Sequence, residues 1–251
     1  MFQAERYHII LEILKRKKSV SIETLCKNSF CSVATMRRDL ISLEKAGLIT
    51  RRRGGASIIA GANTDYAYDF RDSEHNIEKT YICSIAEDYL SDGISLFLDS
   101  SSTVFPICSL LERYKNISVV TNGIAMAFSL AQNVNVDTYI AGGRMKKGSV
   151  SIVGEFASSF IQNFKADVAI ISCRGVDEGG AYEASQEQAL VKQQMMQNAK
   201  TTILLCDSSK FGHSYFYKLS GFSGIEAVIT EKEPAKEISD AIIKSGCEIL
   251  F

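Results

Sequence analysis

Short runs of apolar, strand-type residues alternate with helical patterns from residue 94 to residue 250. The runs that predict strands are Ile94–Leu98, Ile117–Val120, Val136–Ile140, Val168–Ser172, Thr201–Leu205, Ala227–Ile229 and Cys247–Leu250. The segments that predict helices are Glu74–Leu90, Phe105–Arg113, Ile124–Ala131, Glu155–Phe164, Gln186–Ala199 and Pro234–Ser245. In the first of these, apolar residues recur at every fourth position, at Ile77, Tyr81, Ile85 and Tyr89. This alternation predicts a mostly parallel α/β sheet with helices on both faces.

The first 60 residues follow a different pattern, which begins with two short helices. Gln3–Lys17 carries apolar residues near helical period, and its last turn is rich in lysine and arginine, which favours a helix C-terminus. Ile22–Asn28 is the second predicted helix. Either Ser19 or Ser21 can serve as its N-cap.

A third helix is predicted from its N-cap Ser32 to about Ala46, where a glycine follows as a C-cap signal. One side carries an expected buried stripe, Val33, Met36, Leu40 and Leu43. The other side presents Thr35, Arg37, Arg38, Ser42 and Lys45. Leu48–Ile59 has strand-type residues on both sides of an Arg-Arg-Arg-Gly-Gly turn, which predicts a hairpin. Three helices and a β-wing make a winged helix-turn-helix.

The net charge of −1 conceals a basic head on an acidic body. Residues 1–60 carry 12 Lys and Arg against 5 Asp and Glu, whereas residues 61–251 carry 16 against 24. This asymmetry indicates a polyanion partner for the head alone. The alternative is a solvated charged surface without a partner.

The third helix has the side chains that a DNA-reading helix needs. Its N-terminal end is expected to enter the major groove, where a helix fits and the base pairs differ in donors and acceptors. The hydroxyls of Ser32 and Thr35 can reach phosphates or base edges, and Arg37 and Arg38 can fork onto guanine or hold the backbone. The alternative is a solvated face on which Asp39 neutralises the two arginines.

The predicted wing adds three more cations. Arg51, Arg52 and Arg53 are expected to lie along phosphates or in a minor groove, which favours operator DNA as the partner. Because one head reads few base pairs, we expect a homo-oligomer, either a dimer or a tetramer.

The motifs of the head occur together in a known family. Ser-Val-Ala-Thr-Met-Arg-Arg-Asp-Leu at 32–40 is followed by Leu-Glu-Lys-Ala-Gly at 43–47 and by Arg-Gly-Gly-Ala at 53–56. This long pattern closely resembles the DeoR family of bacterial transcriptional regulators. The resemblance implies an operator-binding domain, usually of a repressor, joined to an effector-sensing domain.

Ligands of open α/β sheets bind beyond the carboxyl ends of the strands. The first predicted strand is followed, just before a predicted helix, by Asp99, Ser100, Ser101, Ser102 and Thr103. Hydroxyls and unpaired N–H groups at a helix start suit a phosphate, although a serine-rich capping loop is the alternative. The other strand ends contribute Thr121, Asn122, Gly142, Gly143, Arg174, Gly175, Asp207, Ser209 and Lys210. Glycines such as Gly142 and Gly143 let the backbone approach a ligand.

The same segments resemble the DeoR effector domain, which is similar to ribose-5-phosphate isomerase and typically binds a phosphorylated sugar or related metabolite. The resemblance implies effector contacts at Glu187 and Lys192, and adds Gly154 to the pocket segments. The chain departs from the family pattern at Ser101, where a glycine is usual. Arg174 is a bulky cation that can pair with phosphate or plug the pocket.

The alternative function is a sugar-phosphate isomerase-like enzyme with an accessory winged-helix domain. Such enzymes use a carboxylate base and a lysine, and Asp177, Glu187, Lys192 and Lys210 are candidates by type. The isomerase-like run Asp-Gly-Ala-Asp-Glu is missing, and a DNA-reading head has no purpose in isomerisation. We therefore expect a regulator without enzymatic activity.

The remaining signals predict a cytoplasmic protein without a metal or cofactor. The 3 histidines share no metal-type spacing, and the 7 cysteines form no Cys-x-x-Cys pair. No apolar run approaches the roughly 18 residues of a membrane helix, and the N-terminus has no secretion signal. The predicted domains are residues 1–59 for the head, 60–72 for a linker and 73–251 for the effector domain.

Overall fold

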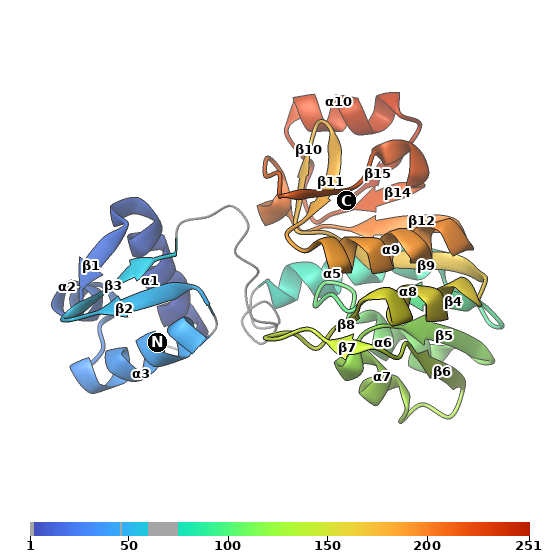
Figure 1. The fold of residues 1–251 in the computed structure, drawn as a ribbon. Helices are drawn as coiled ribbons and strands as arrows, with labels where there is room; N and C mark the ends of the chain where they lie inside the picture. The colour runs from blue at the N-terminus through green and yellow to red at the C-terminus, as the bar shows by residue number, and fades with distance from the viewer. Residues whose placement is uncertain (1–2, 46, 60–74) are drawn as a thin grey trace. The chain divides into compact units, whose positions relative to one another are not determined.

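The computed structural model describes residues 3–45, 47–59 and 75–251. The chain divides into two compact units, Met1–Glu74 and His75–Phe251, which are described separately (Figure 1). The predicted linker, 60–72, lies outside the described residues. The predicted boundaries of the two domains therefore remain predictions.

The N-terminal unit contains three helices and a small sheet. Its helices are α1 (Gln3–Lys17), α2 (Ile22–Ser29) and α3 (Val33–Lys45), and its strands are β1 (Ser19–Ser21), β2 (Ile49–Arg52) and β3 (Gly55–Ile58). The antiparallel strands lie in the order β1-β3-β2, with a turn between β2 and β3 at Gly54, whose φ of +83° suits glycine. The predicted winged helix-turn-helix is confirmed, whereas β1 was not predicted.

Hydroxyl groups begin the two helices of the helix-turn-helix. The Ser21 hydroxyl accepts a hydrogen bond from the N–H of Thr24 at 3.3 Å, and the Ser32 hydroxyl accepts one from the N–H of Thr35 at 3.2 Å. Each bond satisfies one of the N–H groups that a helix start leaves open. Of the two candidate caps of α2, Ser21 is the one that acts.

The buried stripe of α3 differs from the predicted one at one end. Met36, Leu40 and Leu43 are buried, but Val33 is 44% exposed. Val33 lies in the first turn, where the helix has not yet reached the core. The buried face instead includes Asp39, which is 1% exposed.

The C-terminal unit is built on one parallel sheet. Its strands are β4 (Ser95–Leu98), β5 (Ile117–Thr121), β6 (Val136–Ile140), β9 (Ala166–Ser172), β12 (Ala199–Leu205), β14 (Ala227–Ile229) and β15 (Glu248–Leu250). They lie in the order β15-β14-β12-β9-β4-β5-β6. The helices of the unit are α5 (Asn76–Ala86), α6 (Ile107–Leu110), α7 (Ile124–Leu130), α8 (Glu155–Gln162), α9 (Gln186–Asn198) and α10 (Lys236–Lys244).

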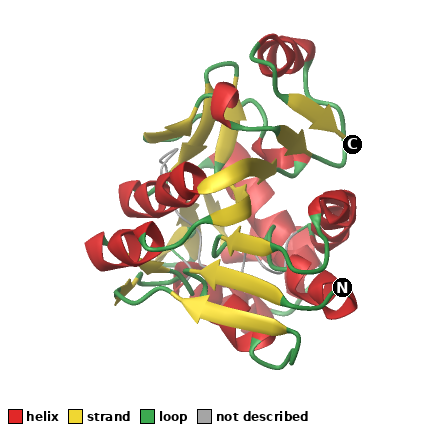
Figure 2. Ribbon diagram, turned by 90° about the vertical axis from the view of Figure 1, so that its right-hand side faces the viewer, coloured by secondary structure: helices red, strands yellow, loops and turns green. Residues whose placement is uncertain are grey.

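Alternation along the strands gives the sheet two hydrophobic cores. Leu96 and Leu98 of β4 pack with α5, α6 and α7, whereas Phe97 packs with α8, α9 and α10. The same alternation occurs in β9, where Ile170 and Ile171 face opposite cores. Since both faces are covered, the central strands β4 and β9 are apolar over most of their length, whereas the edge strand β6 is partly polar and exposed. Figure 2 shows helices on both sides of the sheet.

The order of the strands reverses between β4 and β9. From β4 the chain adds β5 and β6 on one side, then returns to add β9, β12, β14 and β15 on the other. Ligands of such sheets bind in the crevice outside the carboxyl ends at this switch point. The residues after β4, β9 and β12 therefore meet where a ligand is expected.

Short elements beyond the main sheet were not predicted. They are the hairpin of β7 (Arg144–Met145) and β8 (Ile152–Val153), and the sheet of β10 (Gly175–Asp177), β11 (Gly180–Glu183) and β13 (Tyr217–Ser220). The predicted helix at Phe105–Arg113 was also too long. Turns occupy residues 102–106, and α6 begins only at Ile107.

The residues that set the four-residue spacing of α5 do not make up its buried side. Ile77 is 85% exposed and Tyr81 is 48% exposed, whereas Lys79, Ile82, Cys83 and Ala86 are buried. Of the four spaced residues, only Ile85 and Tyr89 pack against the core, and both are partly buried. A lysine takes part in the inner stripe.

An ion pair between the half-buried Arg6 and the buried Asp39 anchors α3 to α1. The Arg6 guanidinium lies 2.7 Å and 3.1 Å from the two oxygens of Asp39, and the hydrogen bond to Asp39 raises the pKa of Arg6. Removing one partner of a buried pair leaves an uncompensated charge, which costs on the order of 3 kcal/mol. We expect Arg6→Met to lower the free energy of unfolding by about this amount, measured by urea unfolding with circular dichroism. Lys17→Met, at an exposed position of the same helix, is the control; equal stability of the two variants would contradict the expectation.

Candidate functional site

The two arginines of α3 lie on its exposed side. Arg37 and Arg38 are both exposed, and neither forms an ion pair with another described residue. Ser32 and Thr35 lie at the start of the same helix, with their hydroxyl oxygens 3.0 Å apart. The residues predicted to read DNA therefore share one end of α3.

Asp39 does not neutralise these arginines. Its carboxylate is buried against Arg6, and its side chain is 2% exposed. The alternative, in which Asp39 is their counter-charge, therefore does not hold. The inward orientation of the acid leaves the outer side of α3 cationic.

The three wing arginines have different environments. Arg51 binds Glu44 of α3, with its Nε 2.6 Å from one carboxylate oxygen and its backbone N–H donating to the other at 2.8 Å. These bonds hold the pKa of Glu44 below its usual range. The Nε of Arg52 donates to the Ser57 hydroxyl at 3.1 Å, and Arg53 is exposed at the turn beside Gly54. Arg51 thus links the wing to α3, while Arg52 and Arg53 extend from the wing itself.

A buried ion cluster lies at the switch point of the parallel sheet. The Asp99 carboxylate follows β4, accepts the N–H of Ser172 at 3.2 Å, and lies 2.9 Å from Nζ of Lys192. The same ammonium group contacts Glu183 of β11 and donates to the backbone oxygen of Ser172 at 2.7 Å. Residues from β4, β9, β11 and α9 therefore converge on one lysine.

The charge of Lys192 depends on its two acids. Burial alone would lower the pKa of Lys192. The carboxylates of Asp99 and Glu183 raise it by more than burial lowers it, so the pKa of Lys192 lies above the usual range. The ammonium form is the stable form at neutral pH. The cluster is a fixed cation between two fixed anions.

A second cation lies beside the first. The Nζ of Lys210 is 2.8 Å from the Thr103 hydroxyl, 2.9 Å from the Ser172 hydroxyl and 3.1 Å from Asp207. Ser209 donates its hydroxyl to the same Asp207 carboxylate. Ser172 joins the two clusters, since its backbone oxygen binds one lysine and its hydroxyl binds the other.

Hydroxyl groups connect the loop after β4 to the loops of β5 and β8. Asn122 accepts the N–H of Ser100 at 3.1 Å and donates to the backbone oxygen of Ile152 at 2.9 Å. The Ser100 hydroxyl lies 2.6 Å from that of Ser151, which also accepts from Gln188 at 3.2 Å. These bonds fix the loop that carries Ser101, Ser102 and Thr103.

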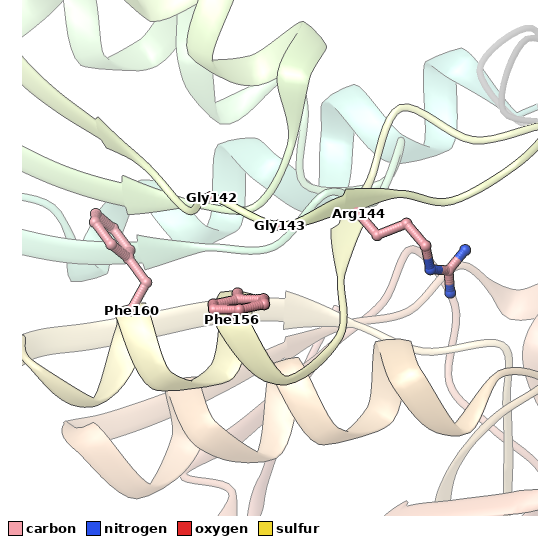
Figure 3. A pocket seen from close by; sticks show the side chains of 5 residues that line it. All are labelled: Gly142, Gly143, Arg144, Phe156 and Phe160. Carbon is pink, nitrogen blue, oxygen red and sulfur yellow. The ribbon is translucent and has the colours of Figure 1, made fainter.

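A shallow pocket of about 550 Å³ lies apart from these clusters. It is lined by Gly142, Gly143, Arg144, Phe156 and Phe160. Figure 3 shows the two phenyl rings near the glycines, with the Arg144 side chain extending away from them. The lining is mostly apolar, and the Arg144 guanidinium already binds Glu187 at 2.5 Å. The buried clusters therefore hold more hydrogen-bond donors than this pocket does.

The structure separates several residues that were predicted together. Glu187 binds the exposed Arg144, whereas Lys192, which also lies on α9, binds Asp99 and Glu183. Arg174 stacks on the ring of Tyr215, with its guanidinium 5.6 Å from the ring centroid. At Gly175 an added Cβ atom would lie 2.2 Å from the backbone oxygen of His213, so chain packing explains this glycine.

Three buried polar residues of the clusters were not predicted from the sequence. Glu183 lies on an unpredicted strand, Ser172 ends a predicted one, and Lys79 of α5 donates to Ser102 at 3.1 Å. A signal for Lys79 was present, because helical spacing places it on one side with Ile82, Cys83 and Ala86. Glu183 and Ser172 had no local signal.

Two family models match the chain. The model described as the DeoR-like helix-turn-helix domain matches residues 6–61, and the model of the DeoR C terminal sensor domain matches residues 74–232. The chain belongs to the DeoR family. It is a helix-turn-helix transcriptional regulator.

Individual relatives have similar length. This DeoR-family chain is 32% identical to the HTH-type transcriptional repressor GlcR of Bacillus subtilis, over 100% of the chain and 96% of that protein. It is 28% identical to the glycerol-3-phosphate regulon repressor of Escherichia coli, over 96% of each. Among solved structures, ribose 5-phosphate isomerase from Plasmodium falciparum is 14% identical, with a TM-score of 0.39 over 54% of this chain and 52% of that one. This last similarity is distant and bears on neither ligand nor activity.

The described part of this DeoR-family chain contains no gathering of three or more His, Cys, Asp or Glu side chains that could hold a metal ion. None of its helices has the length and apolar character that crossing a membrane requires.

The Asp207–Lys210 pair makes stability depend on pH. Burial raises the pKa of Asp207, but Lys210 and Ser209 lower it more, so the folded-state pKa lies below the usual value. The resulting stability is present above the unfolded-state pKa of about 3.9 and is lost as the pH falls below it. We expect Asp207→Asn to destabilise the protein by about 2 kcal/mol at neutral pH.

This difference should shrink at pH values below about 4, because the wild type then loses the same contribution. Urea unfolding at neutral and acidic pH measures it, with Asp137→Asn at an exposed position of β6 as the control. A difference that does not change with pH would exclude this role of the pair.

Proposed function

We propose that this DeoR-family regulator represses a carbohydrate-metabolism operon and that a phosphorylated sugar or related metabolite controls it. The observation that carries the DNA-binding part is the orientation of charges on α3. Arg37 and Arg38 face outward, whereas the neighbouring Asp39 is buried against Arg6. A polyanion can therefore approach the arginines without meeting an acid between them.

In this proposal, each group of arginines has its own task. Arg37 and Arg38 read base edges in the major groove, and Ser32 and Thr35 position the start of α3 on the backbone. Arg52 and Arg53 bind phosphates. Arg51 orients the wing relative to α3, since Glu44 already binds its guanidinium.

The effector part rests on the two buried ammonium groups and the hydroxyls beside them, and on the relatives. One relative is named for a glycerol-3-phosphate regulon. Lys192 and Lys210 provide ammonium groups beside the hydroxyls of Ser101 and Thr103, which are suitable donors for a phosphate. The proposed effector residues are Asp99, Ser100, Ser101, Ser102, Thr103, Thr121, Asn122, Lys192, Asp207, Ser209 and Lys210. The proposal retains Gly142, Gly143, Arg174, Gly175 and Glu187 as residues of the surrounding loops.

The protonation states of the site support a regulator rather than an isomerase. A general base works best when its pKa lies near the working pH. Instead, the pKa of Asp207 is lowered, and the pKa values of Lys192 and Lys210 are raised. All three pKa values are therefore shifted away from neutral pH. Groups held in this way bind charge well and exchange protons poorly.

Control of DNA binding requires coupling between the two units. If the effector weakens operator binding, operator DNA must weaken effector binding by the same factor. We further propose that the protein acts as a dimer or tetramer, because one α3 helix covers too few base pairs to specify an operator.

The DNA part is tested by two contrasting variants, Arg38→Ala and Arg53→Ala. Loss of a base contact at Arg38 should cost about 1–3 kcal/mol for the operator and little for unrelated DNA. Loss of a phosphate contact at Arg53 should reduce the salt slope of binding by about 0.9 without changing sequence preference. Fluorescence anisotropy at several salt concentrations, on an operator selected from random DNA, measures both. Arg16→Ala, at an exposed position of α1, is the control, and unchanged binding by both test variants would exclude this interface.

The effector part is tested by thermal shift of the full chain. Phosphorylated pentoses, phosphorylated hexoses and glycerol-3-phosphate are compared with their unphosphorylated counterparts. A ligand at about 100 times its Kd should stabilise the folded protein by roughly 2.7 kcal/mol. We expect one phosphorylated compound to stabilise the wild type, and Lys210→Ala to lose this response while it retains operator affinity. Equal stabilisation by the sugar without phosphate would contradict the proposed phosphate site.

A further inference from the structure

Two cysteines lie side by side at the turn of the helix-turn-helix. The N–H groups of Phe30 and Cys31 both donate to the backbone oxygen of Cys26, the second of them at 3.3 Å. This backbone closure is that of the Schellman motif, in which the side chains of the two closing positions often contact each other. Here those positions are Cys26 and Cys31, and their thiols are hydrogen-bonded to each other.

These two thiols are also the accessible ones. All seven cysteines lie within the described residues, and Cys26 and Cys31 are half-buried, whereas the other five are buried. Both pack at the rim of the hydrophobic core of the N-terminal unit, where part of each residue meets solvent. A small oxidant such as a hydroperoxide can therefore reach this pair, while burial shields the remaining cysteines.

The two thiols have different electrostatic surroundings. Burial, together with the neighbouring Cys31, raises the pKa of the Cys26 thiol, which therefore stays protonated at neutral pH. Cys31 lies close enough to Arg6 for their charges to interact. A guanidinium beside a sulfur stabilises negative charge there and so favours attack on a peroxide. This difference favours Cys31 as the attacking thiol and leaves Cys26 as the second one.

The pair lies directly before the helix that carries the DNA-reading residues. Cys31 precedes Ser32, whose hydroxyl caps α3 and lies 3.0 Å from that of Thr35. A disulfide joins its sulfur atoms at about 2.05 Å, with a Cβ–S–S–Cβ dihedral of about 90°. Two hydrogen-bonded thiols are farther apart than this, so the bond draws Cys31 toward α2. The start of α3 is attached to Cys31 and moves with it.

We propose that Cys26 and Cys31 form a reversible disulfide when a hydroperoxide oxidises the protein, and that this bond weakens operator binding by displacing the start of α3. The inference rests on the proposed DNA-reading role of α3 and adds to it a site of chemical control. In a reducing compartment such a bond is transient, which suits a signal.

The chemical step balances with hydrogen peroxide as the oxidant. The Cys31 thiolate attacks one peroxide oxygen, the O–O bond breaks, and a sulfenic acid forms while hydroxide leaves. The sulfur of Cys26 then displaces hydroxide from the Cys31 sulfur, and the Cys26 proton converts this hydroxide into water. In total, two thiols lose two hydrogen atoms and one peroxide becomes two waters. A dithiol reductant reverses the bond by thiol–disulfide exchange.

Peptide mapping tests the chemical step on the full chain, oxidised with hydrogen peroxide and then alkylated. Trypsin cleaves after Lys18, Lys27 and Arg37, so the two cysteines fall in separate peptides, 19–27 and 28–37. We expect mass spectrometry to find these peptides joined by a disulfide after oxidation and free after treatment with dithiothreitol. Oxidation of Cys31 to a sulfonic acid without joined peptides would overturn the inference.

Fluorescence anisotropy on the operator measures the consequence. The oxidised wild type should bind about tenfold more weakly than the reduced protein, a loss comparable to that of one base contact, and dithiothreitol should restore binding. Cys26→Ser and Cys31→Ser should bind like the reduced wild type both before and after peroxide. Cys247→Ala, at a buried position of the C-terminal unit, is the control and should keep the wild-type response.

The remaining outcomes distinguish this inference from the DNA interface itself. A disulfide that leaves operator affinity unchanged would overturn the inference, since the bond would not act on α3. An equal loss of affinity in Cys31→Ser would also overturn it, because other residues would then carry the effect. Either result leaves the DNA interface standing. If the reduced wild type binds no selected DNA, both the interface and its control by this pair are overturned.

Discussion

The ammonium group of Lys192 is the point on which the effector unit depends. A buried charge is costly unless opposite charges and hydrogen bonds surround it, and here Asp99, Glu183 and the backbone of Ser172 do so. These partners come from β4, β11 and β9, while the lysine comes from α9. These contacts of Lys192 therefore hold α9, the seven-stranded sheet and the three-stranded sheet in one arrangement. Because the neutral form of the lysine is disfavoured, this arrangement holds across the physiological pH range.

The cluster around Lys192 also holds the loop after β4 in place. Lys192 holds Asp99, the first residue of this loop, while Asn122 and Ser151 hold Ser100, and α6 begins only after a series of turns. The loop is thus fixed at its base, with the hydroxyls of Ser101 and Thr103 beside two ammonium groups. A preformed set of donors loses little conformational entropy when a ligand binds, which supports the proposed effector site.

The sequence predicted the parallel sheet well because its central strands, such as β4 and β9, are buried on both faces and form mostly apolar runs. It also predicted the cap of α3, which depends only on neighbours such as Ser32 and Thr35. It failed for β7, β8 and β10, whose 2 or 3 residues are too few to show a period. Among candidate site residues, Asp99, Lys192 and Lys210 do lie together, but Glu183 and the Asp39–Arg6 pair depend on contacts between residues far apart in sequence. On α5, the four-residue spacing indicated a helix but not its buried side, since Ile77 and Tyr81 are exposed and the inner side includes a lysine.

Both units place their acids in a similar way. In the head, Asp39 is buried with Arg6 and Glu44 holds Arg51, so the acids nearest to α3 are already paired and Arg37, Arg38 and Arg53 give the surface its charge. In the effector unit, Asp99, Glu183 and Asp207 are likewise paired with lysines, and the remaining donors are hydroxyls and N–H groups. The acids of both units are therefore already held by cations within their own unit. The proposed control of DNA binding then requires a ligand whose contacts differ between the DNA-bound and the free state, because a ligand with equal affinity for both states shifts neither.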